Sequence, residues 1–227
     1  MQSISFYNLS YTLIPLIFVA YFYYSWTGDK KDIVYSIIRM LIQLILIGFF
    51  LLYLFENKNL LLGFAVLLFM AIVSSLITLR NTQDKSKKHY GHILTAIAIS
   101  GFIHLFLIIF FVLEIHHFYE PRYVIPIAGM IFANTMNAIS LCVERFEQER
   151  LRSDFITARK IAFKASMIPQ INSLLAVGLV AIPGMMTGQI LSGVDPLIAV
   201  RYQIMIMAMM LSTAGISIIV YFYLKSR

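Results

Sequence analysis

The sequence predicts an all-α protein, a polytopic bundle of about seven transmembrane helices. Its 227 residues are 60% hydrophobic and 13% charged, and the mean hydropathy is +0.83. A soluble domain is about half apolar and a quarter charged. The apolar runs approach or exceed the roughly 20 residues that cross a bilayer as a helix. The alternating patterns of about ten residues that are typical of membrane β-barrels are absent from the sequence.

The candidate spans follow one another with short connections. The first run follows an N-terminal segment that has no basic residue and no small-residue cleavage site, so we expect a retained span and not a removed signal peptide. Backbone groups in hydrocarbon must hydrogen-bond to one another, which makes a helix the expected state of every run. The runs are expected to form a single transmembrane domain over 1–227 and lie at residues 13–24, 33–55, 60–79, 93–115, 124–143, 171–191 and 197–224.

The basic residues predict the orientation of the bundle. When the connections are assigned alternately to two sides, one side holds most Lys and Arg residues, and the other holds only Lys58, Arg122 and Arg201. The positive-inside rule then places the N-terminus outside and the C-terminus in the cytoplasm. The net charge of +7 is therefore expected to face anionic lipid or a protein partner. We expect no nucleic-acid binding, because no recognition motif accompanies the charge.

Several absences limit the possible functions. Cys142 is the single cysteine, so no intrachain disulfide can form. The sequence has no phosphate loop ending in Gly-Lys-Ser/Thr, so the chain is not expected to bind or hydrolyse ATP, and no cofactor is predicted for it. Motifs of metalloproteases and serine hydrolases are missing, as are strings of intramembrane carboxylates. The chain therefore lacks an energy source of its own.

A hydrophilic segment at about 144–168 is the longest between two spans. Its second part alternates apolar residues with Arg and Lys in a pattern that predicts an amphipathic helix, and Pro169 would allow a turn before the next span. Two interpretations stay open. The helix either lies in the membrane interface with its cations toward lipid headgroups, or it docks a soluble subunit. The candidate coupling residues are Arg152, Arg159, Lys160 and Lys164.

The stretch LVAIPGMMTGQILSG, at 179–193, is a poor helix inside an apolar run. Proline removes a backbone donor, and glycine loosens the chain. A break within lipid is tolerated only where protein or water receives the freed backbone groups, as in the discontinuous helices of transporters. We therefore expect this stretch to face another helix or a cavity. Its candidate pathway or gating residues are Pro183, Gly184, Met185, Met186, Gly188 and Gln189.

A second apolar stretch with a helix-breaking residue lies at 123–142, and Pro126 is near its start. Helical spacing places Gly129 and Asn137 on one small, polar stripe, and Met130 and Asn134 on an adjoining stripe. Intramembrane amides seek partners on other helices. The stretch is thus either a packing seam held by amide hydrogen bonds or the wall of a polar path.

Polar residues and methionines also mark the last run and one external loop. Tyr202 and Gln203 begin two methionine-bearing faces of the last span. Such methionines are either flexible core filler or soft ligands on a metal path, and thioether sulfur suits ferric iron poorly. The loop after the fourth span is either solvated or a divalent-ion site. Its candidate ligands, none firmly assigned, are Glu114, His116, His117 and Glu120.

Two blocks carry a family resemblance. VIPIAGMIFANTMNAISLC and VGLVAIPGMMTGQILSGVDPLIAVRYQIMIM, with RMLIQLILIGFFLLYLF at 39–55, resemble the FetB/YbbM family. These are membrane subunits of a bacterial ABC transporter associated with iron export, and plant relatives are linked to aluminium tolerance. The positions that match the family are Arg39, Gln43, Gly48, Pro126, Gly129, Met130, Asn134, Gly178, Pro183, Gly184, Met185, Met186, Gly188, Gly193, Asp195, Pro196, Tyr202 and Gln203.

The resemblance implies a permease of the bacterial inner membrane that pairs with a separate, ATP-binding cytoplasmic ATPase, as two copies of each. The chain departs from the family in one place. The family has a Leu-Gly-Ala element before the sixth span, whereas residues 152–164 here contain no glycine. Either the chain does not couple to an ATPase, or residues 145–164 form a rebuilt docking surface. A stand-alone channel or carrier and a non-transporting scaffold are the alternative functions.

Overall fold

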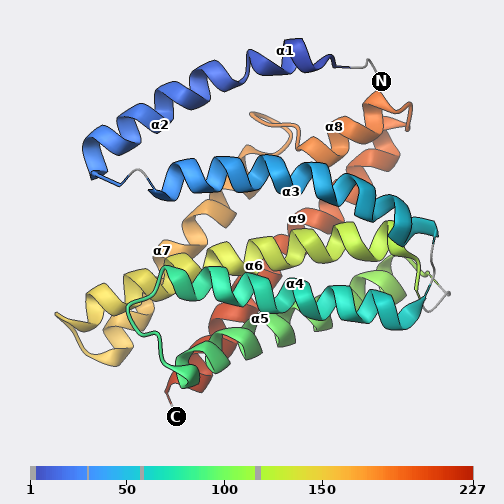
Figure 1. Cartoon of the computed structure of the whole chain (residues 1–227). Coiled ribbons are helices and arrows are strands. Elements are labelled where there is room, and N and C mark those ends of the chain that lie inside the picture. The colour runs from blue at the N-terminus through green and yellow to red at the C-terminus, as the bar shows by residue number, and fades with distance from the viewer. Residues whose placement is uncertain (1–3, 30, 57–58, 116–118, 227) are drawn as a thin grey trace. The chain divides into compact units, whose positions relative to one another are not determined.

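The structure is a computed structural model that describes residues 4–29, 31–56, 59–115 and 119–226. Nearly all of these residues are helical (Figure 1). Their only extended pairing is one bridge between Val177 and Ala181. The chain divides into two compact units, Met1–Asn57 and Lys58–Arg227, which are described separately. The prediction of a helical membrane bundle is confirmed, whereas a single domain over the whole chain stays a prediction.

The first unit consists of α1 (Phe6–Ser10), α2 (Leu13–Thr27) and α3 (Lys31–Glu56). Gly28 ends α2 in a left-handed conformation with φ 74°, and its N–H donates to the carbonyl of Tyr24. Glycine adopts this conformation without the steric cost of a β-carbon. None of the α2 residues is buried. An apolar helix with no buried face is what a lipid-facing span requires.

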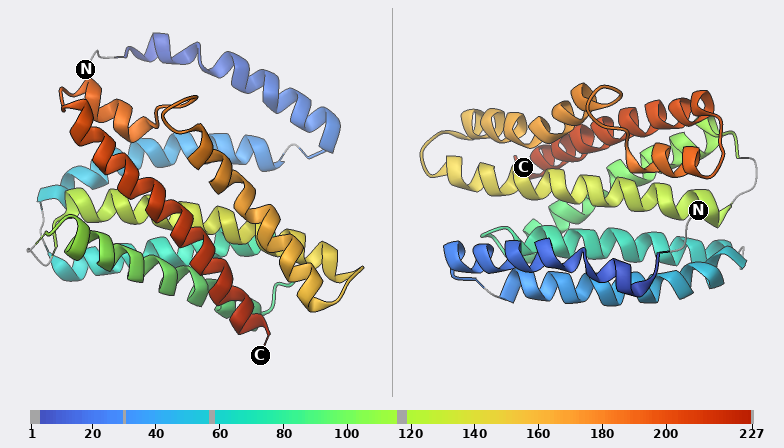
Figure 2. Two further views of the ribbon diagram at one scale, coloured as in Figure 1. Left: turned by 180° about the vertical axis from the view of Figure 1, so that it is seen from behind. Right: turned by 90° about the horizontal axis from the view of Figure 1, so that it is seen from above.

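The second unit contains six α-helices and a short π-helical turn among its described residues. These are α4 (Leu60–Arg80), α5 (Lys87–Leu107) with η1 (Ile108–Val112), α6 (Pro121–Arg150), α7 (Phe155–Ala176), α8 (Gly184–Leu191) and α9 (Pro196–Lys225). From α4 to α7 successive helices run in opposite directions, and α9 packs on α5, α6 and α7 (Figure 2). Several helices begin at polar N-caps that bind the first free N–H groups, which are Asn59, Ser86, Asp154 and Asp195.

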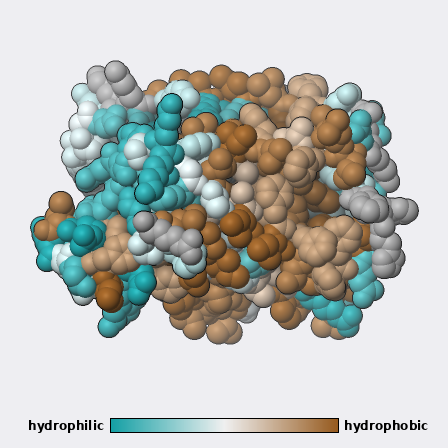
Figure 3. All heavy atoms as spheres, turned by 90° about the horizontal axis from the view of Figure 1, so that it is seen from below, coloured by the Kyte–Doolittle hydropathy of each residue, from teal (hydrophilic) through white to brown (hydrophobic). Residues whose placement is uncertain are grey.

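Three chain segments meet at one end of this unit, where hydrophilic side chains gather (Figure 3). The backbone N–H of Gln83, after α4, donates to Glu147 of α6 at 2.7 Å. Lys225, at the end of α9, lies 3.4 Å from Asp84 and 3.1 Å from His89 Nδ1. The connections that carry most of the basic residues of this unit therefore share one end. This agrees with the alternation predicted from charge, while the inside and outside assignment stays a prediction.

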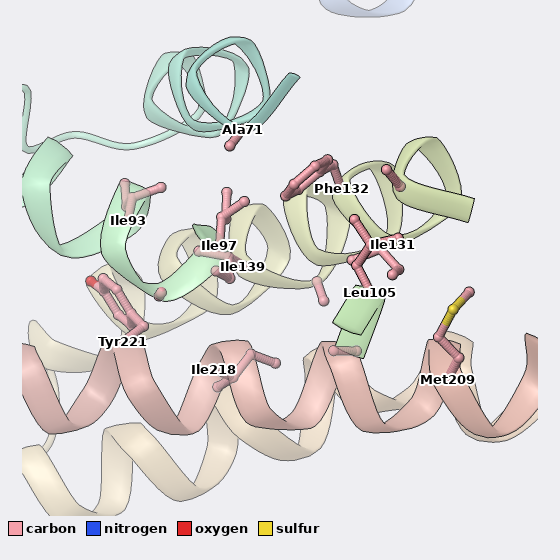
Figure 4. Close-up of a cluster of buried hydrophobic side chains, with 14 of the residues drawn as sticks. Ala71, Ile93, Ile97, Leu105, Ile131, Phe132, Ile139, Met209, Ile218 and Tyr221 are labelled. Atoms are coloured by element: carbon pink, nitrogen blue, oxygen red, sulfur yellow. The ribbon is translucent and has the colours of Figure 1, made fainter. Parts of the chain in front are cut away.

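The core of the second unit lies between α5, α6 and α9 (Figure 4). Ile97, Ile139 and Ile218 are fully buried there. Gly101 of α5 allows a close approach, because a β-carbon at this position would lie 2.5 Å from the ring of Phe132 on α6. This core joins α6 to α9. Of the remaining helices, α7 packs against both α6 and α9, and α8 packs against α9.

The expected span at 171–191 is not one helix. Instead, α7 begins at Phe155, continues through Pro169 and ends at Ala176, and α8 follows after a turn. The expected turn at Pro169 is thus wrong. Proline costs one backbone hydrogen bond inside a helix, and Pro169 is exposed within α7 without ending it. Within the described residues, six other helical segments are long and apolar enough to cross a membrane.

Two further expectations change with the course of these helices. The segment at 144–168 is divided between the end of α6 and the start of α7, with a turn at residues 151–154. The amphipathic helix is therefore continuous with the start of the sixth apolar run, residues 171–176. Pro126 does not interrupt 123–142, because it lies in the second turn of α6.

Candidate functional site

A tight turn separates α7 from α8, and it closes on itself. The N–H groups of Val180 and Ala181 both donate to the carbonyl of Ala176, at 2.8 and 3.1 Å. The N–H of Gly178 donates in turn to the carbonyl of Ala181 at 3.0 Å. This glycine has φ 81°, which only glycine adopts readily. Pro183 then precedes α8, where its missing N–H costs nothing.

Two cavities flank this turn. The first, which we call the turn cavity, has a volume of about 730 Å³ and lies between the turn and α9. The second, the methionine cavity, has a volume of about 460 Å³ and is lined by α6, α7, the turn, α8 and α9. Met207 and Gln203 of α9 line both. The break in the helix thus borders hollow space, as the sequence predicts for a break of this kind.

A buried amide joins three helices beside the methionine cavity. Asn134 of α6 donates to the carbonyl of Met210 at 2.6 Å and to Thr213 Oγ1 at 3.1 Å, both on α9. Gln170 of α7 donates to Asn134 Oδ1 at 2.8 Å. Asn134 is 6% exposed and uses both ends of its amide. The same residue therefore holds α6, α7 and α9 together beside the methionine cavity.

Gln203 differs from Asn134, because its carbonyl oxygen is unused. The side chain is 5% exposed, and Oε1 finds no hydrogen-bond partner within the described chain. Leaving a buried acceptor unpaired costs about 1–3 kcal/mol. Gln189 Oε1 on α8 is also without a partner among the described residues, although that residue is only half-buried. An acceptor of this kind at the wall of two cavities is a candidate ligand for a cation or a polar substrate.

The structure brings some of the predicted pathway residues together and leaves others apart. Those that line one or both cavities are Met130, Pro183, Gly184, Met185, Met186 and Gln203, with Asn134 directly behind them. Pro126 and Asn137 are exposed on α6, and Gly129 faces Met70 of α4. The half-buried residues Gly188, Gln189 and Tyr202 are not among the residues that line either cavity.

Sequence reasoning missed two members of this site, Gln170 and Thr213. They are separated from Asn134 by 36 and 79 positions. One signal was available, since an uncharged amide inside an apolar run usually has a partner on another helix. Which residue Gln170 and Thr213 bond depends on how α7 and α9 pack on α6. The periodicity of the sequence does not show that packing.

The predicted coupling residues lie at the basic end of the second unit. Arg159, Lys160 and Lys164 line a groove of about 700 Å³ between the start of α7 and the end of α9. Arg152 is exposed in the turn before α7 and is not among the groove's lining residues. Asp154 caps α7, and its hydrogen bonds to Thr157 and the neighbouring backbone lower its pKa. The three groove cations stand on a helix that leads directly to the break.

The same end is tied together by Asp84, in the loop before α5. The backbone and side chain of Ser86 donate to this carboxylate, and with His89 and Lys225 they lower the pKa of Asp84 to about 2. Lys225 of α9 approaches it at 3.4 Å. The carboxylate thus stays charged at neutral pH and fixes the end of α9 to this loop.

The candidate ion site in the external loop is only partly within the described chain. Glu114 and Glu120 are described, whereas His116 and His117 lie outside the described residues. Among the residues that the structure describes, no three or more His, Cys, Asp and Glu side chains gather as a metal site. The side-chain donors among the residues that line the methionine cavity are instead thioether sulfurs, amide oxygens and the Ser173 hydroxyl.

Comparison with known proteins decides the family. A model described as an uncharacterised protein family, UPF0014, matches residues 7–156 and 150–227. The chain belongs to UPF0014. A UPF0014 membrane protein of Synechocystis is 35% identical over 200 residues, which is 80% of this chain and 76% of the relative. No solved structure matches the chain.

Two further relatives extend the comparison across bacteria and plants. The probable iron export permease protein FetB of Escherichia coli is 35% identical over 217 residues, 87% of this chain and 81% of that protein. The protein ALUMINUM SENSITIVE 3 of Arabidopsis thaliana is 29% identical over 213 residues, 86% and 76% of the two chains. The resemblance predicted from the two sequence blocks is confirmed. This UPF0014 chain is a multi-pass membrane protein.

Proposed function

We propose that this chain is the permease subunit of an ABC transporter that exports iron or a related metal ion, with ATP hydrolysed by a separate cytoplasmic subunit. The observation that carries the proposal is the broken sixth helix, which borders two cavities in an otherwise apolar bundle. The name of the E. coli relative supports a metal ion as substrate and export as direction.

The break acts as the gate in this proposal. The segment α8 joins α7 and α9 through short turns and packs against α9. Neither Gly184 nor Gly188 touches a neighbour where its β-carbon would be. Their role is therefore conformational freedom and not close packing. When the ATPases close, α7 moves at its basic end, and the turn at 177–183 lets α8 swing and open the cavities.

A double variant tests the gate. Gly184→Leu with Gly188→Leu stiffens α8 and fills part of the methionine cavity, so ATP-dependent metal export from vesicles should be abolished. Assembly with the ATPase should be intact, because both positions lie far along the chain from the basic groove. Export at the wild-type rate in this double variant would remove the gating role.

A second copy of the chain is proposed to cover the break. Leu179 is 90% exposed and Val180 is 85% exposed at the tip of the turn. A non-helical backbone at membrane depth needs protein or water beside it. A cysteine at Leu179, in a Cys142→Ala background, should form a cross-link between two copies in membranes. A cysteine at Leu61, 77% exposed at the start of α4, is the control and should not.

The ATPase is proposed to dock on Arg152, Arg159, Lys160 and Lys164. Exposed cations on a helix that continues to the break would pass a movement of the ATPase directly to the gate. Reversing the three groove charges to Glu should release a co-purified ATPase, whereas Arg201→Glu at the other end of α9 should not. Retention of the ATPase by the reversed variant would assign these cations to lipid headgroups instead.

A further inference from the structure

The methionine cavity offers an unusual set of donor atoms. Its lining includes four thioethers, from Met130 of α6, Met185 of α8, and Met207 and Met210 of α9. It also includes the amides of Gln170 and Gln203. Thioether sulfur is a soft donor that favours soft metals such as Cu(I) over hard ions such as Fe(III).

The oxygen of Gln203 is the second observation that points to a ligand. Its neighbour Gln170 donates to Asn134, and Asn134 binds α9, so these amides are engaged. Gln203 Oε1, by contrast, is buried with no partner in the described part of the chain. A carbonyl oxygen is an acceptor only, and a rotation of the Gln203 side chain would bring this oxygen to a cation in the cavity.

The charge of the lining restricts the ion further. None of the described residues that line the methionine cavity is charged. The cost of moving an ion out of water rises with the square of its charge, and no carboxylate is present here to compensate it. A singly charged ion therefore suits the cavity far better than a doubly or triply charged one.

We propose that the methionine cavity binds a soft, singly charged metal ion, of which Cu(I) is the biological example, through its thioethers and Gln203 Oε1. The proposal rests on the proposed function only for the step that carries the ion across the membrane. Binding itself needs neither the ATPase nor transport. Because Met185 lies on α8 while Met207 and Met210 lie on α9, a movement of α8 withdraws a ligand and releases the ion.

Silver provides the probe, because Ag(I) has the same charge and ligand preference as Cu(I) and does not change oxidation state. The purified full-length chain is first changed to Cys142→Ala, which removes the one thiol. We expect one Ag(I) to bind each chain in a calorimetric titration. Changing Met130, Met185, Met207 and Met210 together to Leu should weaken binding at least tenfold, and Gln203→Leu should weaken it less.

Matched variants separate binding from folding. Met205→Leu with Met209→Leu changes two methionines of the same helix that do not line the cavity, and should leave Ag(I) affinity unchanged. Leu replaces Met with little change of volume, so these substitutions should preserve packing. If the fourfold variant unfolds, a milder variant carries only two of the changes, Met185→Leu and Met207→Leu. X-ray absorption at the silver edge should show sulfur neighbours around the ion, and fewer of them in this milder variant.

The proposal is overturned if no Ag(I) binds, or if the fourfold and the control variants bind it equally. Its failure is distinct from failure of the proposed function. Loss of Ag(I) binding with intact ATP-dependent iron export would remove only the soft-metal site. Absence of export with intact Ag(I) binding would remove only the exporter.

Discussion

Replacing Asn134 with Leu tests whether the buried amide holds the site together. The substitution removes three hydrogen bonds between helices, two to α9 and one from Gln170 of α7. Hydrogen bonds between membrane helices average about 0.6 kcal/mol each in double-mutant cycles, so the loss should be about 2 kcal/mol. Leu is a larger side chain than Asn, so crowding at this buried position adds to the loss from the missing hydrogen bonds.

The measurement is the free energy of unfolding of the purified chain in mixed micelles, titrated with a denaturing detergent and followed by circular dichroism. Asn137→Leu is the matched control, because Asn137 lies on the same helix but is exposed; it should cost less than about 0.5 kcal/mol. Gln170→Leu alone should cost about 0.6 kcal/mol, and the Asn134–Gln170 cycle should show a coupling of similar size. Equal losses in Asn134→Leu and Asn137→Leu, or strict additivity in the cycle, would refute the role of the amide.

Two other predictions concern packing and pH. Gly101→Ala should lower the free energy of unfolding by about 1–3 kcal/mol, because its β-carbon meets the Phe132 ring; Gly91→Ala on the same helix meets no atom within 4 Å and should cost nothing. An equal loss in both would contradict this packing. The pKa of Asp84 is about 2 when folded against an ordinary 3.8, so its stabilising contribution is present above about pH 4 and is lost as the pH falls toward 2. Unfolding midpoints should therefore fall more steeply over this interval in the wild type than in Asp84→Asn, and parallel curves would contradict the hydrogen bonds from Ser86 that chiefly lower this pKa.

Much of the fold follows directly from the sequence. The predicted run at 60–79 matches α4, which extends one residue further, to Arg80. Asn59 supplies the N-cap at the start of the helix, and Arg80 marks the membrane surface at its end. Asp195 and Pro196 likewise fix the start of α9. Apolar length, caps and charge are local properties, so a single chain reveals them.

The course of α7 could not be predicted in the same way. Pro169 suggests a turn by its local chemistry, yet the helix continues through it. Whether a proline ends or merely bends a helix depends on the packing of the turns on both sides. The break instead falls at Gly178, whose positive φ the sequence permits but does not require.

The candidate site was predicted in part. Helical spacing places Met130 and Asn134 on one stripe of α6. In the structure Met130 lines the methionine cavity and Asn134 is hydrogen-bonded to Gln170 of its lining, whereas Gly129 and Asn137 lie elsewhere. Periodicity shows which residues share a face, but not which face meets another helix. Gln170 entered the site only through tertiary packing.

Accessibility of Met207 to water tests the central claim most directly, because this residue lines both cavities in the middle of an apolar bundle. Cysteines are placed at Met207 or at Met209, which is two residues away and 2% exposed, each in the Cys142→Ala chain in membranes. A charged, membrane-impermeant thiol reagent should modify the cysteine at 207 and not the one at 209. Modification of neither position, or of both at the same rate, would contradict a water-filled path beside the broken helix.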